Sequence, residues 1–191
     1  MDLDTVAEAR LVAEALAGSQ PAYERIVRRY QRPIISLIAR MTGDRALAED
    51  LAQETFVKAF RNLAAFDTTR RLSSWLLRIA HNAAVDAMRR SHMRMVPLES
   101  DDGLTAGSHA APAPSIDSIE RAALGNALDA ALAGLRPEHR AAVVLRYEQG
   151  LAFDEIGHVL GVAEATARSH VHRARKELAR RLTAAGWEPA R

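Results

Sequence analysis

Apolar residues recur with the spacing of an α-helix along most of this chain of 191 residues, and this periodicity constrains its fold more than any other feature. Between Pro21 and Met41 they stand at positions i, i+3, i+4 and i+7, which places them on one face of a helix. Aromatic residues make up only 5% of the chain, and alternating β-branched or aromatic residues are scarce. Because strands favour those residue types, the sequence predicts an all-α protein.

The same spacing predicts several further helices. Pro33 lies inside the first apolar stripe and should kink or divide that helix, because an interior proline removes a backbone hydrogen-bond donor. Asp44 can cap the next helix, whose apolar face runs from Ala48 to Leu63. The remaining helices are expected at residues 72–92, 118–133, 137–149, 154–160 and 164–184.

A stretch without periodicity separates the chain into two halves. Residues 93–117 contain three of the seven prolines, and residues 96–120 carry five acids with no lysine or arginine. This composition is typical of a flexible linker, and about 25 residues at ~3.3 Å each could span about 80 Å, so the halves could dock far apart. The sequence therefore predicts small helical domains at residues 1–92 and 118–191, joined by a flexible acidic linker at residues 93–117.

The residue types and patterns that are absent exclude several classes of protein. With no cysteine, the chain can form neither disulfides nor thiolate metal sites. Its acidic start differs from a secretory signal, and no apolar run approaches the ~18 residues that cross a bilayer. It has no nucleophile elbow and no phosphate-binding loop, and its histidines at 158, 170 and 172 lack the partners of a metal site. We therefore expect a cytoplasmic protein without catalysis, metal, cofactor, small-molecule substrate or membrane insertion.

Basic residues are concentrated in two blocks, although the net charge of the chain is only +2. Residues 70–94 hold six arginines against one acid, and residues 165–181 hold six basic residues against one acid. A basic block attracts a polyanion more strongly than the small net charge suggests, so this distribution is compatible with binding to DNA.

Residues 154–169 have the pattern of a helix-turn-helix motif. Gly157 is small where two crossing helices need close approach, and Gly161 can supply the turn between them. The second helix would bury its apolar side and expose a mostly basic side that suits the major groove of DNA. The alternative is an ordinary helical hairpin with a solvated basic face. The residues of this candidate DNA-binding face are Arg168, Ser169, His172, Arg173, Arg175 and Lys176.

Three blocks of sequence follow one another along the chain: DRALAEDLAQETF at residues 44–56, SWLLRIAHN at residues 74–82, and residues 166–176. Together they resemble the extracytoplasmic-function (ECF) group of the sigma-70 family of bacterial transcription initiation factors. The resemblance implies that the chain binds core RNA polymerase and promoter DNA and assists promoter melting. Its first half would contact the −10 element and its second half the −35 element. An anti-sigma factor is a further partner that the resemblance allows.

The resemblance also assigns a partner to the polar side of the helix that follows Asp44. This side would bind the coiled coil of the polymerase β′ clamp, and the β flap is the second polymerase contact that the resemblance implies. Without the resemblance these residues would be interpreted as a solvated face, and Glu49 could serve only solubility or an intrahelical pair with Arg45. The residues of this acidic face are Glu49, Asp50, Gln53 and Glu54.

For the −10 element, the resemblance implies a loop and helix start that accept an unstacked base. Stacking and hydrogen bonds in a protein pocket must recover the cost of unstacking that base. Trp75 also lies on the apolar stripe, where core packing is the alternative, and the same alternative applies to Phe66. The candidate −10 residues are Phe66, Arg70, Arg71, Ser74, Trp75, Arg78, Asn82 and Arg89; Arg71, Ser74, Arg78, Asn82 and Arg89 are expected to face outward.

Two other classes of protein remain open at this point. A stand-alone helix-turn-helix repressor or activator would bind duplex DNA without polymerase, as a dimer on a palindrome. A protein-interaction module would use its basic faces to bind an acidic partner. The acidic face discriminates between these classes, because only the polymerase-dependent function requires it. Within the motif, Ala152 stands where the family often has a capping Ser or Thr, and Asp154 could be the substitute cap.

Overall fold

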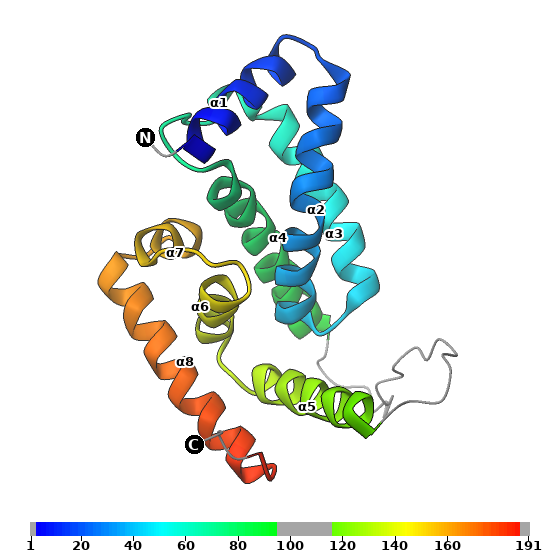
Figure 1. The fold of residues 1–191 in the computed structure, drawn as a ribbon, viewed down its shortest axis with the longest axis vertical. Helices are drawn as coiled ribbons and strands as arrows, with labels where there is room; N and C mark the ends of the chain where they lie inside the picture. The colour runs from blue at the N-terminus through cyan, green and yellow to red at the C-terminus, as the bar shows by residue number, and fades with distance from the viewer. Residues whose placement is uncertain (1–2, 95–115, 188–191) are drawn as a thin grey trace.

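The computed structural model describes residues 3–94 and 116–187, and within these ranges every regular element is a helix (Figure 1). This confirms the all-α fold class predicted from the sequence. The predicted flexible linker at residues 93–117 lies almost entirely outside the described residues. Among the described helices, none has the length and apolar character that a membrane crossing requires. The elements are α1 (Leu3–Leu16), α2 (Gln20–Thr42), α3 (Arg45–Arg61), the 3-10 helix η1 (Leu63–Ala65), α4 (Leu72–Arg94), α5 (Ile116–Ala133), α6 (Pro137–Tyr147), α7 (Phe153–Leu160) and α8 (Glu164–Ala184).

Helices α2, α3 and α4 pack against one another and form the core of the first half. Asp44 caps α3 as predicted, since its carboxylate accepts a hydrogen bond of 3.0 Å from the Leu47 N–H. Of the two effects predicted for Pro33, a kink or a division of the helix, the division does not occur: α2 continues past Pro33 to Thr42. Tyr30 and Ile34, on either side of the proline, are both buried, and this packing outweighs the roughly 3 kcal/mol that an interior proline costs.

The apolar periodicity does not predict α1, which the structure shows as the first helix of the chain. Its buried residues Leu11, Val12 and Ala15 pack onto the core formed by α2 and α4. One carboxylate, that of Glu8, is buried with them and is only 4% exposed. The first half is therefore a bundle of four helices, in which α1 contacts α2, α4 and η1.

The second half is built around α6, α7 and α8, which contact one another. Gly161 ends α7 with φ of 69°, and a Cβ at Gly157 would lie 2.7 Å from the backbone oxygen of Val162. Both glycines therefore serve the close turn that the sequence predicts for a helix-turn-helix motif. The prediction that Asp154 caps this helix is wrong. The residue that directly precedes α7 is Ala152, and its N–H donates a hydrogen bond of 2.8 Å to the carboxylate of Glu155 in the first turn.

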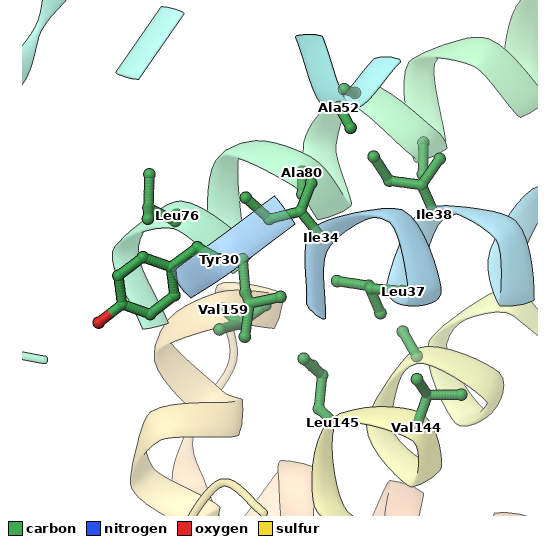
Figure 2. Close-up of a cluster of buried hydrophobic side chains, with 14 of the residues drawn as sticks. Tyr30, Ile34, Leu37, Ile38, Ala52, Leu76, Ala80, Val144, Leu145 and Val159 are labelled. Carbon is green, nitrogen blue, oxygen red and sulfur yellow. The ribbon is translucent and has the colours of Figure 1, made fainter. Parts of the chain in front are cut away.

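The two halves lie against each other and share one continuous apolar core. Helix α7 packs on α4, and both α5 and α6 contact α2 (Figure 1). In Figure 2, Leu37 of α2 faces Val144 and Leu145 of α6, and Val159 of α7 lies beside Tyr30 of α2. In this arrangement the halves are docked directly together, so the first helix of the helix-turn-helix lies over the start of α4.

Candidate nucleic-acid interface

Helix α8 presents a basic face on the side opposite its buried residues. Ala167, Val171 and Ala174 are buried against α6 and α7, as the helical spacing predicts. The residues predicted to form the DNA-binding face are exposed along the same helix: Arg168, Ser169, His172, Arg173, Arg175 and Lys176. The structure therefore brings all six predicted residues onto one accessible helix surface.

Local contacts hold the start of this face in place. Arg168 donates a hydrogen bond of 2.7 Å to Glu164, and its guanidinium carbon lies 4.5 Å from the centre of the Phe153 ring. Arg146 approaches the same ring at 4.7 Å, which places two cations on one aromatic side chain. Arg168 is therefore preorganised, and Glu164 competes with DNA for its guanidinium.

The far end of α8 differs, because its basic residues already have acidic partners. Arg180 and Arg181 both donate to Glu177, at 2.7 and 2.9 Å. The hydrogen bond from Arg180 is the main cause that lowers the pKa of the Glu177 carboxyl. The positive charge at this end is thus partly neutralised within the helix.

On α4 and the loop before it, the structure divides the predicted −10 residues into two groups. Arg70, Arg71, Arg78, Asn82 and Arg89 are exposed. Three others belong wholly or partly to the core: Phe66 (7% exposed), Ser74 (3% exposed) and the half-buried Trp75.

The expectation that Ser74 faces outward is therefore wrong. Its hydroxyl donates to the Arg71 carbonyl at 2.9 Å, and helix α4 is packed on more than one side, by α2, α3 and α7. The rings of Phe66 and Trp75 pack together with centres 5.3 Å apart. The aromatic pair thus packs together at the two ends of the loop between η1 and α4, and this contact agrees with the core-packing alternative for Trp75.

The loop between η1 and α4 is held by Asp67. Its carboxylate accepts hydrogen bonds from the Thr69 N–H at 3.0 Å and the Thr69 hydroxyl at 2.7 Å. The Thr69 bonds are the main cause that lowers the pKa of Asp67, and the Arg70 guanidinium, 3.4 Å away, contributes further. At the other end of the loop, the Leu72 N–H donates to Glu8 at 2.7 Å. The candidate loop thus has a defined conformation before any ligand binds.

Helix α7 contacts the two arginines of this loop. Arg70 Nη1 lies 3.1 Å from His158 Nδ1, and Arg71 Nε lies 3.8 Å from a Glu155 carboxylate oxygen. Burial lowers the pKa of His158, and the positive charges of Arg70 and Arg78 lower it further. No local pattern in the sequence signals these contacts, because the partners are more than 80 residues apart. A nucleic acid that binds Arg70 and Arg71 therefore competes with His158 and Glu155 of α7 for these two guanidiniums.

The predicted acidic face lies on the outer side of α3. All four of its residues, Glu49, Asp50, Gln53 and Glu54, are exposed. Glu49 lies 3.4 Å from Arg45, which is the intrahelical pair that the sequence allowed, and Glu54 lies 3.9 Å from Lys58. These are exposed i,i+4 pairs worth a few tenths of a kcal/mol, so a binding partner can replace them at little cost.

Two histidines of the helix-turn-helix half, His139 and His170, lie side by side. The rings of His139 and His170 lie 5.2 Å apart, and within residues 3–94 and 116–187 no three His, Cys, Asp or Glu side chains are grouped to hold a metal ion. Burial is the main cause that lowers the pKa of His139, and the charge of His170 adds to the effect.

Comparison with known proteins gives matches to both halves of the chain. Residues 26–94 match the family described as Sigma-70 region 2, and residues 125–178 match the family described as Sigma-70, region 4. The ECF RNA polymerase sigma factor SigW of Bacillus subtilis is 32% identical over 179 residues, which cover 90% of this chain and 94% of that protein. The RNA polymerase sigma factor CarQ of Myxococcus xanthus is 37% identical over 174 residues, which cover 91% of this chain and 97% of that protein.

A solved structure shows a similar fold. It is a co-crystal structure of the sigma factor RpoE with the anti-sigma factor NepR from Bartonella quintana. The TM-score is 0.67 and the sequence identity 24%, and the match covers 84% of this chain and 96% of that one. At this identity the likeness concerns the fold, including the presence of both helical halves.

Proposed function

The chain belongs to the ECF group of the sigma-70 family of RNA polymerase sigma factors, and we propose that its two halves divide promoter recognition between them. As a member of this family it is a transcription initiation factor that binds RNA polymerase and promoter DNA. A stand-alone repressor or activator is not favoured, because the family match includes the first half as well as the helix-turn-helix.

The second half is assigned to the −35 element. The observation that carries this assignment is the single exposed face of α8, which presents six polar and mostly basic side chains beyond the turn at Gly161. An α-helix fits the major groove of B-DNA, where arginine can bind guanine through two hydrogen bonds. In this proposal Arg168, Ser169 and Arg173 reach base edges or the nearest phosphates.

The first half is assigned to the −10 element and to strand opening. Arg70, Arg71, Arg78, Asn82 and Arg89 are exposed along one basic helix and the loop before it, which suits the backbone of a melted strand. Phe66, Ser74 and Trp75 are assigned to the walls and floor of the pocket for an unstacked base, and the half-buried Trp75 is the more exposed of the two aromatic residues.

The acidic face of α3 is assigned to the polymerase. Its side chains Asp50, Gln53 and Glu54 are exposed, and its charge is complementary to a basic surface such as the coiled coil of the β′ clamp. The polymerase supplies the chemistry of RNA synthesis, so the chain itself needs no catalytic group. We place its action in the cytoplasm, with the polymerase, and we assign the β flap to the second half.

Promoter binding requires the two halves to separate from the arrangement described here. The −10 and −35 elements lie about 25 base pairs apart, or roughly 85 Å of B-DNA at ~3.4 Å per base pair. Helix α8 has 21 residues and is therefore about 31 Å long, and its half is docked on α4. We therefore assign the docked arrangement of the two halves to the protein that is not bound to a promoter. An anti-sigma factor that binds the docked form would keep the protein inactive.

A reconstitution experiment tests the proposal. The purified chain is added to core RNA polymerase of the source bacterium, and promoters are selected from random DNA by binding and run-off transcription. We expect initiation from a defined pair of elements only when the chain and the core enzyme are both present. Tight binding of the chain alone, as a dimer on palindromic duplex DNA, would instead support a stand-alone regulator.

A further inference from the structure

Glu8 joins three helices through one buried carboxylate. Its Oε1 atom accepts a hydrogen bond of 2.5 Å from the Tyr30 hydroxyl on α2 and lies 3.6 Å from the Arg29 guanidinium. Its Oε2 atom accepts a hydrogen bond of 2.7 Å from the backbone N–H of Leu72, the first residue of α4. The two oxygens therefore have separate partners: one fastens α1 to α2, and the other caps α4.

The cap matters because α4 has no acceptor at the usual position. The residue before Leu72 is Arg71, whose guanidinium carries donors and no acceptor, so it cannot satisfy the free N–H groups at the start of a helix. Glu8 supplies the acceptor instead, from a position 64 residues earlier in the chain. Its negative charge also lies at the helix N-terminus, where the helix dipole favours it.

This cap lies at one end of the loop that the −10 proposal uses. Asp67 fixes the first part of the loop through its hydrogen bonds with Thr69. Glu8 fixes the end of the loop, because it binds the N–H of Leu72, where α4 begins after Arg71. Between these two carboxylates the chain carries Arg70 and Arg71, both exposed. The direction in which these arginines leave the backbone thus depends on where α4 begins.

We propose that Glu8 is a positioning residue for −10 strand capture: by capping α4 it holds Arg70, Arg71 and the Phe66–Trp75 pair in the geometry that receives an unstacked base. The proposal rests on the proposed −10 function of this loop. Glu8 touches no DNA itself, since it is only 4% exposed. Its removal should slow strand opening while leaving polymerase binding through α3 and −35 binding through α8 unchanged.

The separate partners of the two oxygens provide matched variants. Tyr30→Phe removes the hydroxyl hydrogen bond at Oε1, leaves the Arg29 guanidinium 3.6 Å from that oxygen, and keeps the cap at Oε2. The double variant Glu8→Met with Tyr30→Phe replaces both partners of the buried bond by apolar groups of similar size, which limits the loss of stability, and it removes the cap. Glu8→Gln keeps the cap, because its amide oxygen can accept from Leu72 N–H while its amide NH₂ donates to the Tyr30 oxygen.

The experiment uses holoenzyme assembled from the full chain and core polymerase, with a promoter selected by the wild-type protein and labelled with 2-aminopurine in the −10 non-template strand. The fluorescence rise reports base unstacking. We expect Tyr30→Phe and Glu8→Gln to open the promoter within about twofold of the wild-type rate, and the double variant to be about tenfold slower, the size expected for a lost helix cap. Affinity for core polymerase and for a −35 duplex should be equal in all four proteins.

Two results would overturn the inference. The first is equal opening by the double variant and Tyr30→Phe; the second is a loss in the double variant that is matched by its loss of core binding or of thermal stability. If the wild-type holoenzyme opens no promoter, the proposed function fails and the inference fails with it. If all four proteins open the promoter normally, only the inference about Glu8 fails.

Discussion

Arg70 Nη1, in the loop before α4, lies 3.1 Å from His158 Nδ1, on the first helix of the helix-turn-helix. This contact joins a residue assigned to the −10 strand to the half assigned to the −35 element. Because an arginine only donates hydrogen bonds, the facing nitrogen of His158 must be unprotonated for the contact to be favourable. We therefore expect the docking of the two halves to depend on the protonation of His158.

Acidification should weaken the docking of the two halves. Burial and the charges of Arg70 and Arg78 lower the pKa of docked His158, and Asp67 opposes them, while Arg71 is paired with Glu155 nearby. A base with a lowered pKa binds fewer protons in the docked form, so its contribution to docking is complete above the ordinary pKa of about 6.5 and is lost as the pH falls below it.

Energy transfer between two fluorophores, one on each half, can measure this effect of pH on docking. The chain has no cysteine, so cysteines introduced at the exposed positions Ala64 and Thr183 can carry a donor and an acceptor fluorophore. We expect energy transfer to fall between pH 7.5 and pH 5.5, and His158→Gln to remove this change while His139→Gln keeps it. An unchanged pH dependence in His158→Gln would show that another group controls docking.

A second contact between the halves predicts a charge-reversal effect. Arg40 on α2 pairs with Glu148 at 2.8 Å and with Asp129, and Ser36 donates to Glu148 at 2.8 Å. Glu148→Arg places like charges together, which should shift the balance toward the separated form by roughly 1 kcal/mol for such partly exposed groups. The same fluorophore pair should report lower energy transfer at pH 7.5, whereas Glu138→Arg, whose partner is Arg136, should not change it.

Much of this structure follows from local sequence patterns, which explains where prediction succeeds. The cap at Asp44 and the turn at Gly161 are predicted because each depends on residues within a few positions of it. Helix α1 is not predicted, since its alanine-rich sequence has no narrow apolar stripe and its place is decided by packing on α2. The unbroken helix at Pro33 likewise depends on tertiary packing that outweighs a local preference.

The candidate site shows the same division. The exposed basic residues of α8 follow from a single helical period, so all six are predicted correctly as exposed. Ser74 is predicted on the wrong side, because α4 is covered on more than one side and its buried face is wider than one stripe. Glu8 and His158 act through partners 64 and 88 residues away, and no short-range pattern records such a pairing.

The helix-turn-helix should tolerate no side chain at Gly157. A Cβ there would lie 2.7 Å from the Val162 backbone oxygen, so Gly157→Ala forces the turn apart and should cost about 1–3 kcal/mol. Gly125→Ala is the matched control on α5, where the added Cβ meets open space and should stabilise the helix by up to about 1 kcal/mol. Thermal unfolding followed by circular dichroism measures both, and a neutral Gly157→Ala would contradict the proposed close approach.

Charge reversal on α3 should abolish polymerase binding without unfolding the chain. Asp50 and Glu54 are exposed, so Asp50→Arg with Glu54→Arg leaves the core unchanged and places like charges against a basic partner. The control Glu138→Arg with Asp154→Arg changes the net charge by the same amount on the second half. Co-purification with core polymerase should be lost only in the first variant; its retention in the folded protein would remove α3 as the contact surface.

Residues at the start of α8 should contact DNA bases, whereas residues near its end should contact only the DNA backbone. Arg168 and Arg180 are 12 residues apart, about 18 Å at ~1.5 Å per residue, whereas the major groove is roughly 12 Å wide, so both cannot contact the same few bases. Arg168→Ala or Arg173→Ala should cost roughly 1–3 kcal/mol on the correct −35 duplex and reduce discrimination. Arg180→Ala should weaken binding to all sequences slightly, since Glu177 already neutralises part of that charge.

Binding of the full chain to matched and scrambled −35 duplexes, across a salt series, distinguishes the two roles. A phosphate contact lowers the slope of log K against log salt on both duplexes, whereas a base contact changes affinity mainly on the matched one. Because Glu164 competes with DNA for the Arg168 guanidinium through its 2.7 Å bond, Glu164→Gln should raise the affinity mainly for the matched duplex if Arg168 reads a base. Equal losses on the two duplexes for Arg168→Ala and Arg173→Ala would identify these residues as phosphate contacts.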